Sequence, residues 1–124
     1  MGFMVDQEEV RRVALTLPEA VENPDHSGFR VRNKQFAWVW HERVVPGKPR
    51  VPRPDVLAVR VAGQAEKDML LASDPDKFFT EPHYNGFPAV LVRLAFLDAG
   101  ELRELVTDAW RCQAPGALVR DSGL

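Results

Sequence analysis

Apolar residues recur at helical spacing near the N-terminal end of this 124-residue chain. The repeat consists of Val10, Val13, Ala14 and Leu17, which share one face of a helix with 3.6 residues per turn. Asp6 precedes the repeat, and Glu9 follows Asp6 by three residues, the spacing of a capping box. The pattern therefore predicts a helix that begins at Asp6 and is ended by Pro18.

A second amphipathic repeat lies near the C-terminus. Its apolar members are Leu102, Leu105, Val106, Ala109 and Trp110. Asp98 and Glu101 just before it have the capping-box spacing again, and Pro115-Gly116 follow it. We expect a closing helix whose Leu105 and Trp110 are buried against a sheet.

Between these helices the apolar and polar residues alternate with the period of β-strands. Segments 28–32 and 35–41 flank Asn33-Lys34, which predicts a hairpin with a two-residue turn at that dipeptide. In this register Val31 lies opposite Phe36, and Phe29 lies opposite Trp38. The hairpin aromatics, Trp38 included, then share a core face with Val31, so core packing is favoured over a base-stacking platform. Trp40, beyond the paired region, is expected to be partly exposed.

Further elements follow the hairpin. The stretch VVPGKPRVPRP at 44–54 is dense in proline, which predicts a stiff, extended loop without regular pairing. Segments 55–62 and 89–94 alternate again and predict two more strands. Between them, Gly63 opens a helix to about Ser73, on which Ala65, Met69 and Ala72 recur at helical spacing.

The predicted fold is a single α+β domain over residues 1–116. Its elements follow the order α-β-β-β-α-β-α, and its antiparallel sheet carries helices packed on one face. Residues 117–124 are expected to form a flexible C-terminal tail.

Composition sets broad limits on the class of protein. Hydrophobic residues make up 45% and charged residues 27% of the chain, ordinary values for a globular domain. The single cysteine, Cys112, excludes an internal disulfide framework. No apolar run approaches the length of a membrane span, and the N-terminus lacks the basic start of a signal peptide. A soluble, cytoplasmic protein is expected.

The charge is unevenly distributed along the chain. The net charge is −2, yet the stretch from Arg30 to Arg60 contains eight basic and two acidic residues, a local charge of +6. A basic face on an acidic molecule attracts polyanions locally. Alternatively, acidic helices and a basic sheet favour solubility and mutual attraction, and this reading stays equally open.

Strand alternation places Arg30, Arg32, Arg60 and Arg93 on the face away from the apolar core. Further cations lie in the turn and loop: Lys34, Lys48, Arg50 and Arg53. Arginine pairs bidentately with phosphate and with carboxylate alike. These eight residues therefore form either a nucleic-acid interface or a set of ion pairs, for example within a dimer.

A second candidate site lies in the turn before the last strand, where polar and aromatic groups are concentrated. These residues are Glu81, His83, Tyr84 and Asn85. Glu81 with His83 or Tyr84 is conceivable as a general acid–base pair, whereas a structural hydrogen bond is an alternative for His83. A metal site needs a third ligand, which the spacing does not supply. No nucleophile elbow, phosphate loop or zinc motif is present, so the chain is expected to be a non-enzymatic protein without a metal or cofactor.

The chain resembles the MmcQ/YjbR family of small bacterial proteins. The resemblance rests on VRRVALTLPEAVE in the first helix, FRVRNKQFAWV in the hairpin and, above all, FFTEPHYNGFPAVLVRL at 78–94. It implies a fold like that of the frataxin-like CyaY superfamily and a DNA-binding protein with a double-wing motif, which makes duplex DNA the leading partner. The alternative is a binding module that takes a small molecule or a protein in a cleft near His83 and Tyr84.

Overall fold

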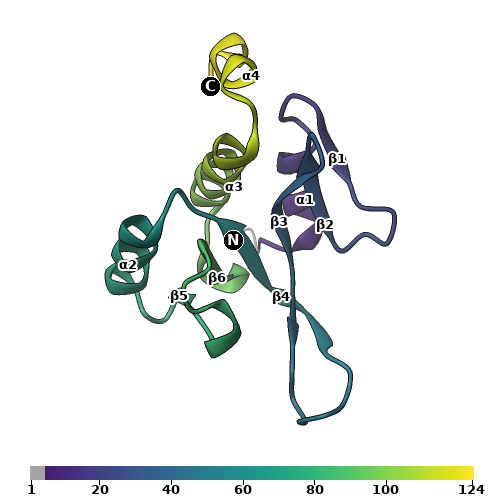
Figure 1. Cartoon of the computed structure of the whole chain (residues 1–124), viewed down its shortest axis with the longest axis vertical. Helices are drawn as coiled ribbons and strands as arrows, with labels where there is room; N and C mark the ends of the chain where they lie inside the picture. The colour runs from purple at the N-terminus through teal and green to yellow at the C-terminus, as the bar shows by residue number, and fades with distance from the viewer. Residues whose placement is uncertain (1–4) are drawn as a thin grey trace.

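The computed structural model describes residues 5–124, which form a six-stranded antiparallel sheet with helices packed mainly on one face (Figure 1). The strand order is β1-β2-β3-β4-β6-β5. The elements are α1 (Gln7–Ala14), β1 (Ala20–Glu22), β2 (Gly28–Val31), β3 (Lys34–Glu42), β4 (Val51–Arg60), α2 (Gln64–Ser73), β5 (Phe78–Phe79), the 3-10 turn η1 (Pro82–Tyr84), β6 (Ala89–Arg93), the 3-10 turn η2 (Leu94–Phe96), α3 (Ala99–Gln113) and α4 (Gly116–Ser122). The predicted α+β class is confirmed.

Helices α1 and α3 begin where the capping pattern predicts. In α1, the carboxylate of Asp6 accepts a hydrogen bond of 3.0 Å from the amide of Glu9. In α3, Asp98 and Glu101 form the complete reciprocal capping box. The C-terminal limit of α1 is corrected, because the helix ends at Ala14, four residues before Pro18.

The main core lies between these two helices and the sheet. It joins Val10 of α1 and Val106 of α3 to strand residues such as Phe36 and Val92. Trp110 is 0% exposed, and its indole Nε1–H donates to the carbonyl of Pro18 at 3.0 Å. Leu105 is only partly buried. The closing helix therefore packs on the sheet through Trp110, as its pattern predicts.

The register of the first long hairpin differs from the prediction. Its turn lies at Arg32-Asn33, with φ of 49° and 66°, and Val31 pairs with Lys34. A turn with positive φ at both central residues matches the twist of the strands. The predicted Asn33-Lys34 turn is thus displaced by one residue, and Val31 does not lie opposite Phe36.

A β-bulge further changes the orientation of the second strand. Phe29 pairs with Ala37 while Arg30 pairs with Gln35, so β3 contains one extra residue, Phe36, at this point. The extra residue reverses the side-chain alternation beyond it. Phe36 enters the helix-side core, whereas Trp38 lies on the opposite face and pairs with Gly28, not with Phe29. A Cβ at Gly28 would lie 2.7 Å from the Cβ of Trp38, so only glycine fits this crossing.

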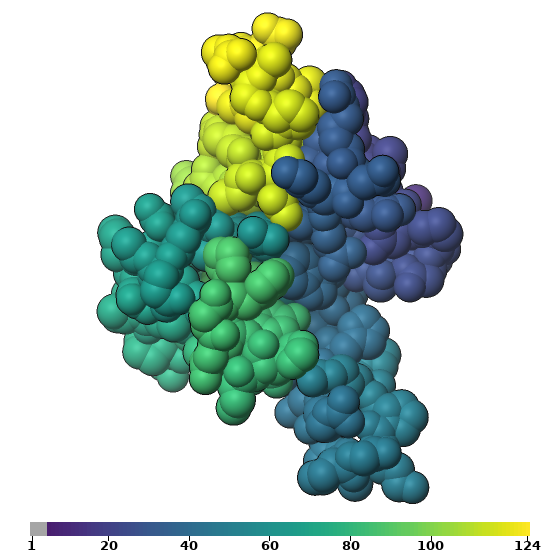
Figure 2. Space-filling model, viewed as in Figure 1, coloured from purple at the N-terminus to yellow at the C-terminus, as the bar shows by residue number. Residues whose placement is uncertain are grey.

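Several elements lie where the sequence predicted loops. The chain between the first helix and the hairpin contains β1, which pairs with β2. The proline-rich stretch is partly strand, because Pro52 and Arg53 pair with His41 and Trp40. Proline is tolerated there because β6 pairs only with Val56–Arg60, so this part of β4 has a free edge. Residues 42–53 form the protruding end of the β3–β4 hairpin, called here the basic arm (Figure 2).

The end of the chain is helical instead of an irregular tail. Residues Gly116–Ser122 form α4, whose Leu118 and Val119 pack against the main core. The interior of α2 also differs from the prediction, because Met69 is exposed and the residues turned inward are Lys67, Leu70 and Leu71. Both differences have one physical cause: the burial of these short helices depends on neighbours that are distant in sequence.

Candidate functional site

The sheet face away from α1 and α3, called here the open face, has its own small apolar cluster. The cluster consists of Trp40, Val56, Ala58, Tyr84, Ala89 and Leu91, with Trp38 and Phe79 packed against it. The prediction that Trp38 joins the helix-side core is therefore wrong, and Trp40, expected to be partly exposed, is buried. The cause is the bulge at Phe36, which turns both tryptophans to the open face.

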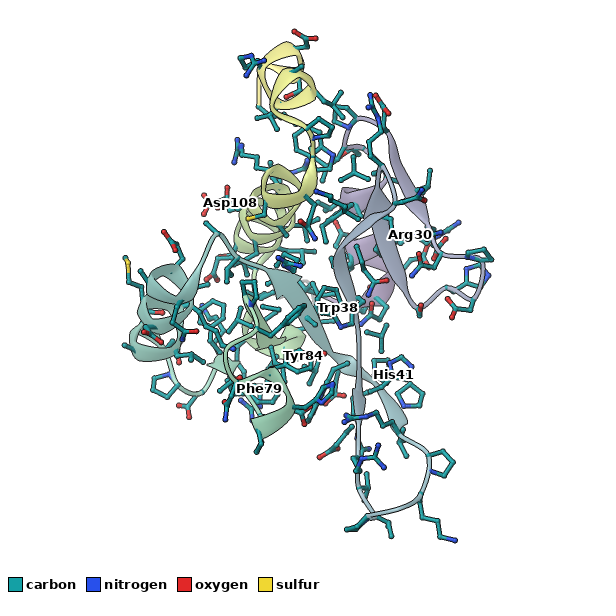
Figure 3. The ribbon with its side chains drawn as sticks, viewed as in Figure 1. Arg30, Trp38, His41, Phe79, Tyr84 and Asp108 are labelled. Carbon is teal, nitrogen blue, oxygen red and sulfur yellow. The ribbon has the colours of Figure 1, made fainter. Side chains whose placement is uncertain are left out.

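The turn η1 places an aromatic ring over this face. Pro82 occupies the first turn of η1, where its missing amide costs nothing. Tyr84 is 8% exposed, and its hydroxyl accepts a hydrogen bond of 3.0 Å from the indole Nε1–H of Trp38 (Figure 3). Burial raises the pKa of the Tyr84 phenol, because the phenolate would be poorly solvated there.

A buried lysine holds the segment that carries Tyr84 and Phe87. Lys67 of α2 is 2% exposed, and its Nζ donates to the carbonyls of Tyr84 at 2.6 Å and Phe87 at 3.0 Å. Burial lowers the pKa of Lys67. Sequence reasoning missed this residue, although its place three and four positions before Leu70 and Leu71 put it on the inward face of α2.

Beside Tyr84 lies a hollow of about 390 Å³, called here the aromatic hollow. Its lining residues are Gln35, Trp38, Arg60, His83, Tyr84, Phe87 and Gln113. The ring centroids of Trp38 and Tyr84 lie 6.4 Å and 6.0 Å from that of Phe87, at steep angles of 62° and 72°. The guanidinium carbon of Arg60 lies 5.0 Å from the centre of the Phe87 ring.

Three of the predicted arginines lie on the open face. Arg60 pairs with Ala89 and Arg93 with Val56, both partners being members of the open-face cluster. Arg30 pairs with Gln35, which lines the aromatic hollow. The guanidinium carbon of Arg93 lies 4.1 Å from the centre of the Phe79 ring, within the range of a cation–π contact.

The other predicted cations have more varied surroundings. Arg32 lies in the hairpin turn and forms an ion pair with Glu19, so it does not extend the open face as alternation predicted. Arg50 donates to the carbonyl of His41 at 3.0 Å and lies 3.6 Å from the carboxylate of Glu81. Arg53 donates to Glu42 at 2.7 Å. Lys34 and Lys48 are exposed.

The four residues of the second predicted site do not come together. His83 and Tyr84 line the aromatic hollow, with ring centroids 5.8 Å apart. Glu81 instead faces Arg50, and Asn85 is exposed. Sequence reasoning missed four residues that line the hollow: Trp38, Phe87, Gln35 and Gln113. The bulge decides which face Trp38 occupies, and the packing of α3 against the sheet brings Gln113 to Gln35.

Ion pairing divides the cations of the described residues into two groups. Those without a carboxylate within 4.0 Å are Arg30, Lys34, Arg43, Lys48, Arg60, Lys67, Arg93, Arg103 and Arg120. Apart from buried Lys67 and helical Arg103 and Arg120, all of these lie on the sheet strands or in the basic arm. Arg11 and Arg12 of α1 and Arg111 of α3 are paired with carboxylates instead.

Residues 5–124 form neither a metal-binding cluster nor a membrane-spanning helix. Within this range, no three side chains of His, Cys, Asp or Glu lie close enough together to hold a metal ion. Likewise, no helix of the described range combines the length and apolar character that crossing a bilayer demands.

The fold and site define a small α+β protein with one helix-covered sheet face and one open face that carries arginines and aromatic rings. The model of the YjbR family matches residues 15–112, and the chain belongs to this family. It is 37% identical over 123 residues to "Uncharacterized protein Rv2570" of Mycobacterium tuberculosis and, equally, to "Uncharacterized protein Mb2600" of Mycobacterium bovis, covering 94% of this chain and 95% of each relative.

A solved structure has the same fold. The crystal structure of Deinococcus radiodurans protein DR2400, a DUF419 domain, superposes with a TM-score of 0.65 and covers 98% of this chain and 90% of that one. The sequence identity is 19%, so this similarity concerns the fold alone.

Proposed function

We propose that this protein binds DNA, with the phosphates held by cations of the open face and the basic arm. The observation that carries the proposal is the group of cations without carboxylate partners, which concentrates on these strands and this arm. Cations paired with carboxylates have less capacity left for a phosphate, whereas arginines without a carboxylate partner keep N–H groups that can donate to a phosphate. A cytoplasmic location and a non-enzymatic role remain predictions that accompany this proposal.

The arginines of the open face are held in position before any ligand arrives. Arg60 lies against Phe87 and Arg93 against Phe79, and Nη1 of Arg93 also donates to the carbonyl of Asp76 at 3.0 Å. Positioned side chains lose less conformational entropy on binding. This arrangement supports recognition of a regularly spaced anion such as a sugar–phosphate backbone.

The basic arm suits a backbone or groove contact. It projects from the body of the molecule (Figure 2) and contains Arg43, Lys48, Arg50 and Arg53 against the single carboxylate of Glu42. Its prolines stiffen it, which lowers the entropy lost on docking. In this proposal the projecting basic hairpin acts as a wing of the double-wing motif that the family resemblance implies.

The test is a fluorescence-anisotropy titration against random-sequence duplex DNA at two salt concentrations. Replacing Arg30, Arg60 and Arg93 together by Gln should weaken binding on every sequence about equally. It should also flatten the dependence of log K on log salt by about 0.9 for each phosphate that the variant no longer neutralises. The matched control replaces Arg11, Arg12 and Arg111 by Gln, the same change of charge on the paired, helical side.

The control variant should bind like wild type to within about twofold, since electrostatic steering by distant charges is a minor effect at moderate salt. Absence of binding by wild type even at low salt would refute the proposal. An equal weakening of binding in both triple variants would attribute binding to net charge alone and would remove the open face from it.

A second candidate function is favoured by the aromatic hollow itself. A hollow of about 390 Å³ lined by three aromatic rings and one arginine lies within the size range of small-molecule pockets. If DNA binding fails, a small molecule or a protein segment near His83 and Tyr84 becomes the better ligand class.

A further inference from the structure

We propose that the aromatic hollow takes one unpaired base of a DNA strand, so that the protein binds single-stranded DNA more tightly than duplex. This inference rests on the proposed nucleic-acid binding and specifies its ligand. Only Arg60 is shared with the proposed phosphate contacts, and the rings and amides of the hollow are separate residues, so the two ideas are separable by experiment.

Phe87, which lines the hollow, leaves surface available for stacking. Its ring meets those of Trp38 and Tyr84 at steep angles instead of stacking on them. Phe87 is 40% exposed although it is held by its neighbours, so core packing does not account for its position. Base–aromatic stacking tolerates any base, because every base has a π-face.

The rim of the hollow offers one amide donor and one amide acceptor. The side-chain carbonyl of Gln35 accepts from Asn23 at 2.9 Å, which leaves its NH₂ group without a partner among the described residues. The NH₂ group of Gln113 donates to the backbone carbonyl of Gln35 at 2.9 Å, which leaves its own side-chain oxygen unbonded within the described range. Base edges carry donors and acceptors side by side, so these amides complement an unpaired base.

A cation completes the arrangement. Arg60 lines the same hollow, and its guanidinium carbon lies 5.0 Å from the centre of the Phe87 ring. An arginine beside these rings can reach the phosphate attached to a bound base. Aromatic platforms flanked by cations are the usual design for single-stranded nucleic acid, whereas a base within a duplex must leave its stack to enter a hollow.

The ring-bearing segment is held rigid by Lys67. Its two hydrogen bonds fix the carbonyls of Tyr84 and Phe87, the residues that carry two of the three rings. Lys67 is buried and does not face the ligand, so it acts as a positioning residue. A fixed platform binds a base without the entropic cost of ordering a loop.

The experiment compares a labelled 12-nucleotide thymidine strand, its duplex with adenosine, and the same strand carrying abasic sites. The proteins are wild type, Phe87→Leu and the control Phe96→Leu, which changes an exposed ring (54% exposed) outside the hollow. Phe87→Leu should weaken single-strand binding about tenfold, as expected when one ring no longer stacks on a base, with duplex binding changed less than twofold. Wild type should bind the abasic strand more weakly by a similar factor, and Phe96→Leu should behave like wild type.

Each other outcome contradicts a defined part of the proposal. If wild type binds neither strand nor duplex at low salt, the proposed DNA binding fails and this inference with it. If both forms bind and Phe87→Leu weakens them equally or not at all, only the base-binding inference is wrong. If free thymidine monophosphate competes for binding as well as the unlabelled 12-nucleotide strand does, the hollow is a small-molecule site, and the proposal that it binds a base of a DNA strand is wrong.

Discussion

On the helix-covered face of the sheet, large side chains such as Trp110 are fully buried and hydrogen-bonded, whereas the open face combines buried and partly exposed rings with unbonded polar atoms. Trp110 illustrates the first face, since its indole donates to Pro18. Buried side-chain atoms without a hydrogen-bond partner in the described part of the chain are Asn23 Oδ1, Arg30 Nε, Trp40 Nε1, Arg60 Nε, Thr80 Oγ1 and Glu81 Oε1, the last of which lies 3.6 Å from Arg50. The arginines and Trp40 of this set belong to the open face.

This difference indicates that the helix-covered face stabilises the fold, whereas the open face is suited to binding. An unbonded buried polar group costs about 1–3 kcal/mol, so native proteins keep few of them. Three of the six atoms, Arg30 Nε, Trp40 Nε1 and Arg60 Nε, belong to the open face, so packing there leaves hydrogen-bonding groups unused. The helix-covered face holds the fold together, and the open face carries the arginines and rings that we propose to meet a ligand.

The largest expected effect tests the helix-covered face. Trp110→Ala should lower the free energy of unfolding by about 3–5 kcal/mol, because it removes a fully buried large aromatic side chain and leaves a cavity. Urea denaturation followed by circular dichroism measures the change. A decrease below about 1 kcal/mol would mean that α3 contributes little to the core, and the contrast between the two faces would disappear.

An intermediate effect is expected where the two regions meet, at Lys67. Lys67→Met keeps the apolar stem but removes both hydrogen bonds to the carbonyls of Tyr84 and Phe87. The free energy of unfolding should fall by about 2 kcal/mol, since two hydrogen bonds from a charged donor are lost. The carbonyls of Tyr84 and Phe87 each keep one backbone donor, the amides of Phe87 and Ala89. The control is Lys34→Met, an exposed lysine whose replacement should change stability by less than about 0.5 kcal/mol.

Equal stability of the Lys67→Met variant and wild type would show that the two lysine hydrogen bonds add little to the backbone hydrogen bonds that these carbonyls already accept. Lower amide exchange protection of Asn85 and Phe87 in the variant would confirm that the lysine holds this segment. Unchanged protection would contradict its positioning role.

The smallest effect concerns the titration of Tyr84, the single tyrosine of the chain. Burial raises its pKa above the ordinary value of about 10. The folded protein therefore holds the phenol proton more tightly than the unfolded chain. The corresponding stability is fully present below pH of about 10 and is lost as the pH rises through the raised folded pKa.

Phenolate absorbance, followed against pH in the folded protein and in urea, reads this residue alone. The folded midpoint should lie above the unfolded one, and Trp38→Phe should alter it by removing the indole hydrogen bond to the hydroxyl. A titration midpoint of the folded protein at or below that of the unfolded chain would mean that the Tyr84 phenol is exposed to water.

Local chemistry in the sequence determined the starts and the buried faces of the terminal helices. Capping pairs such as Asp98 and Glu101 act within four residues. The apolar repeat of the helix identifies Trp110 as inward-facing without any knowledge of the sheet. Alternation likewise placed Arg60 and Arg93 on the face away from the main core. These features depend on neighbours close in the chain, so the sequence alone was sufficient for them.

Only the tertiary structure decided which residues form the aromatic hollow. One extra residue in β3, Phe36, reverses the side-chain alternation of the strand beyond it, because side chains alternate with a period of two. Trp38 therefore lies on the open face instead of in the expected core. The partners that favour this bulge, and those that bury Lys67 and bring Gln113 to the rim, come from segments far away in sequence. Their packing energy outweighs local pattern, and it acts only when the whole chain has folded.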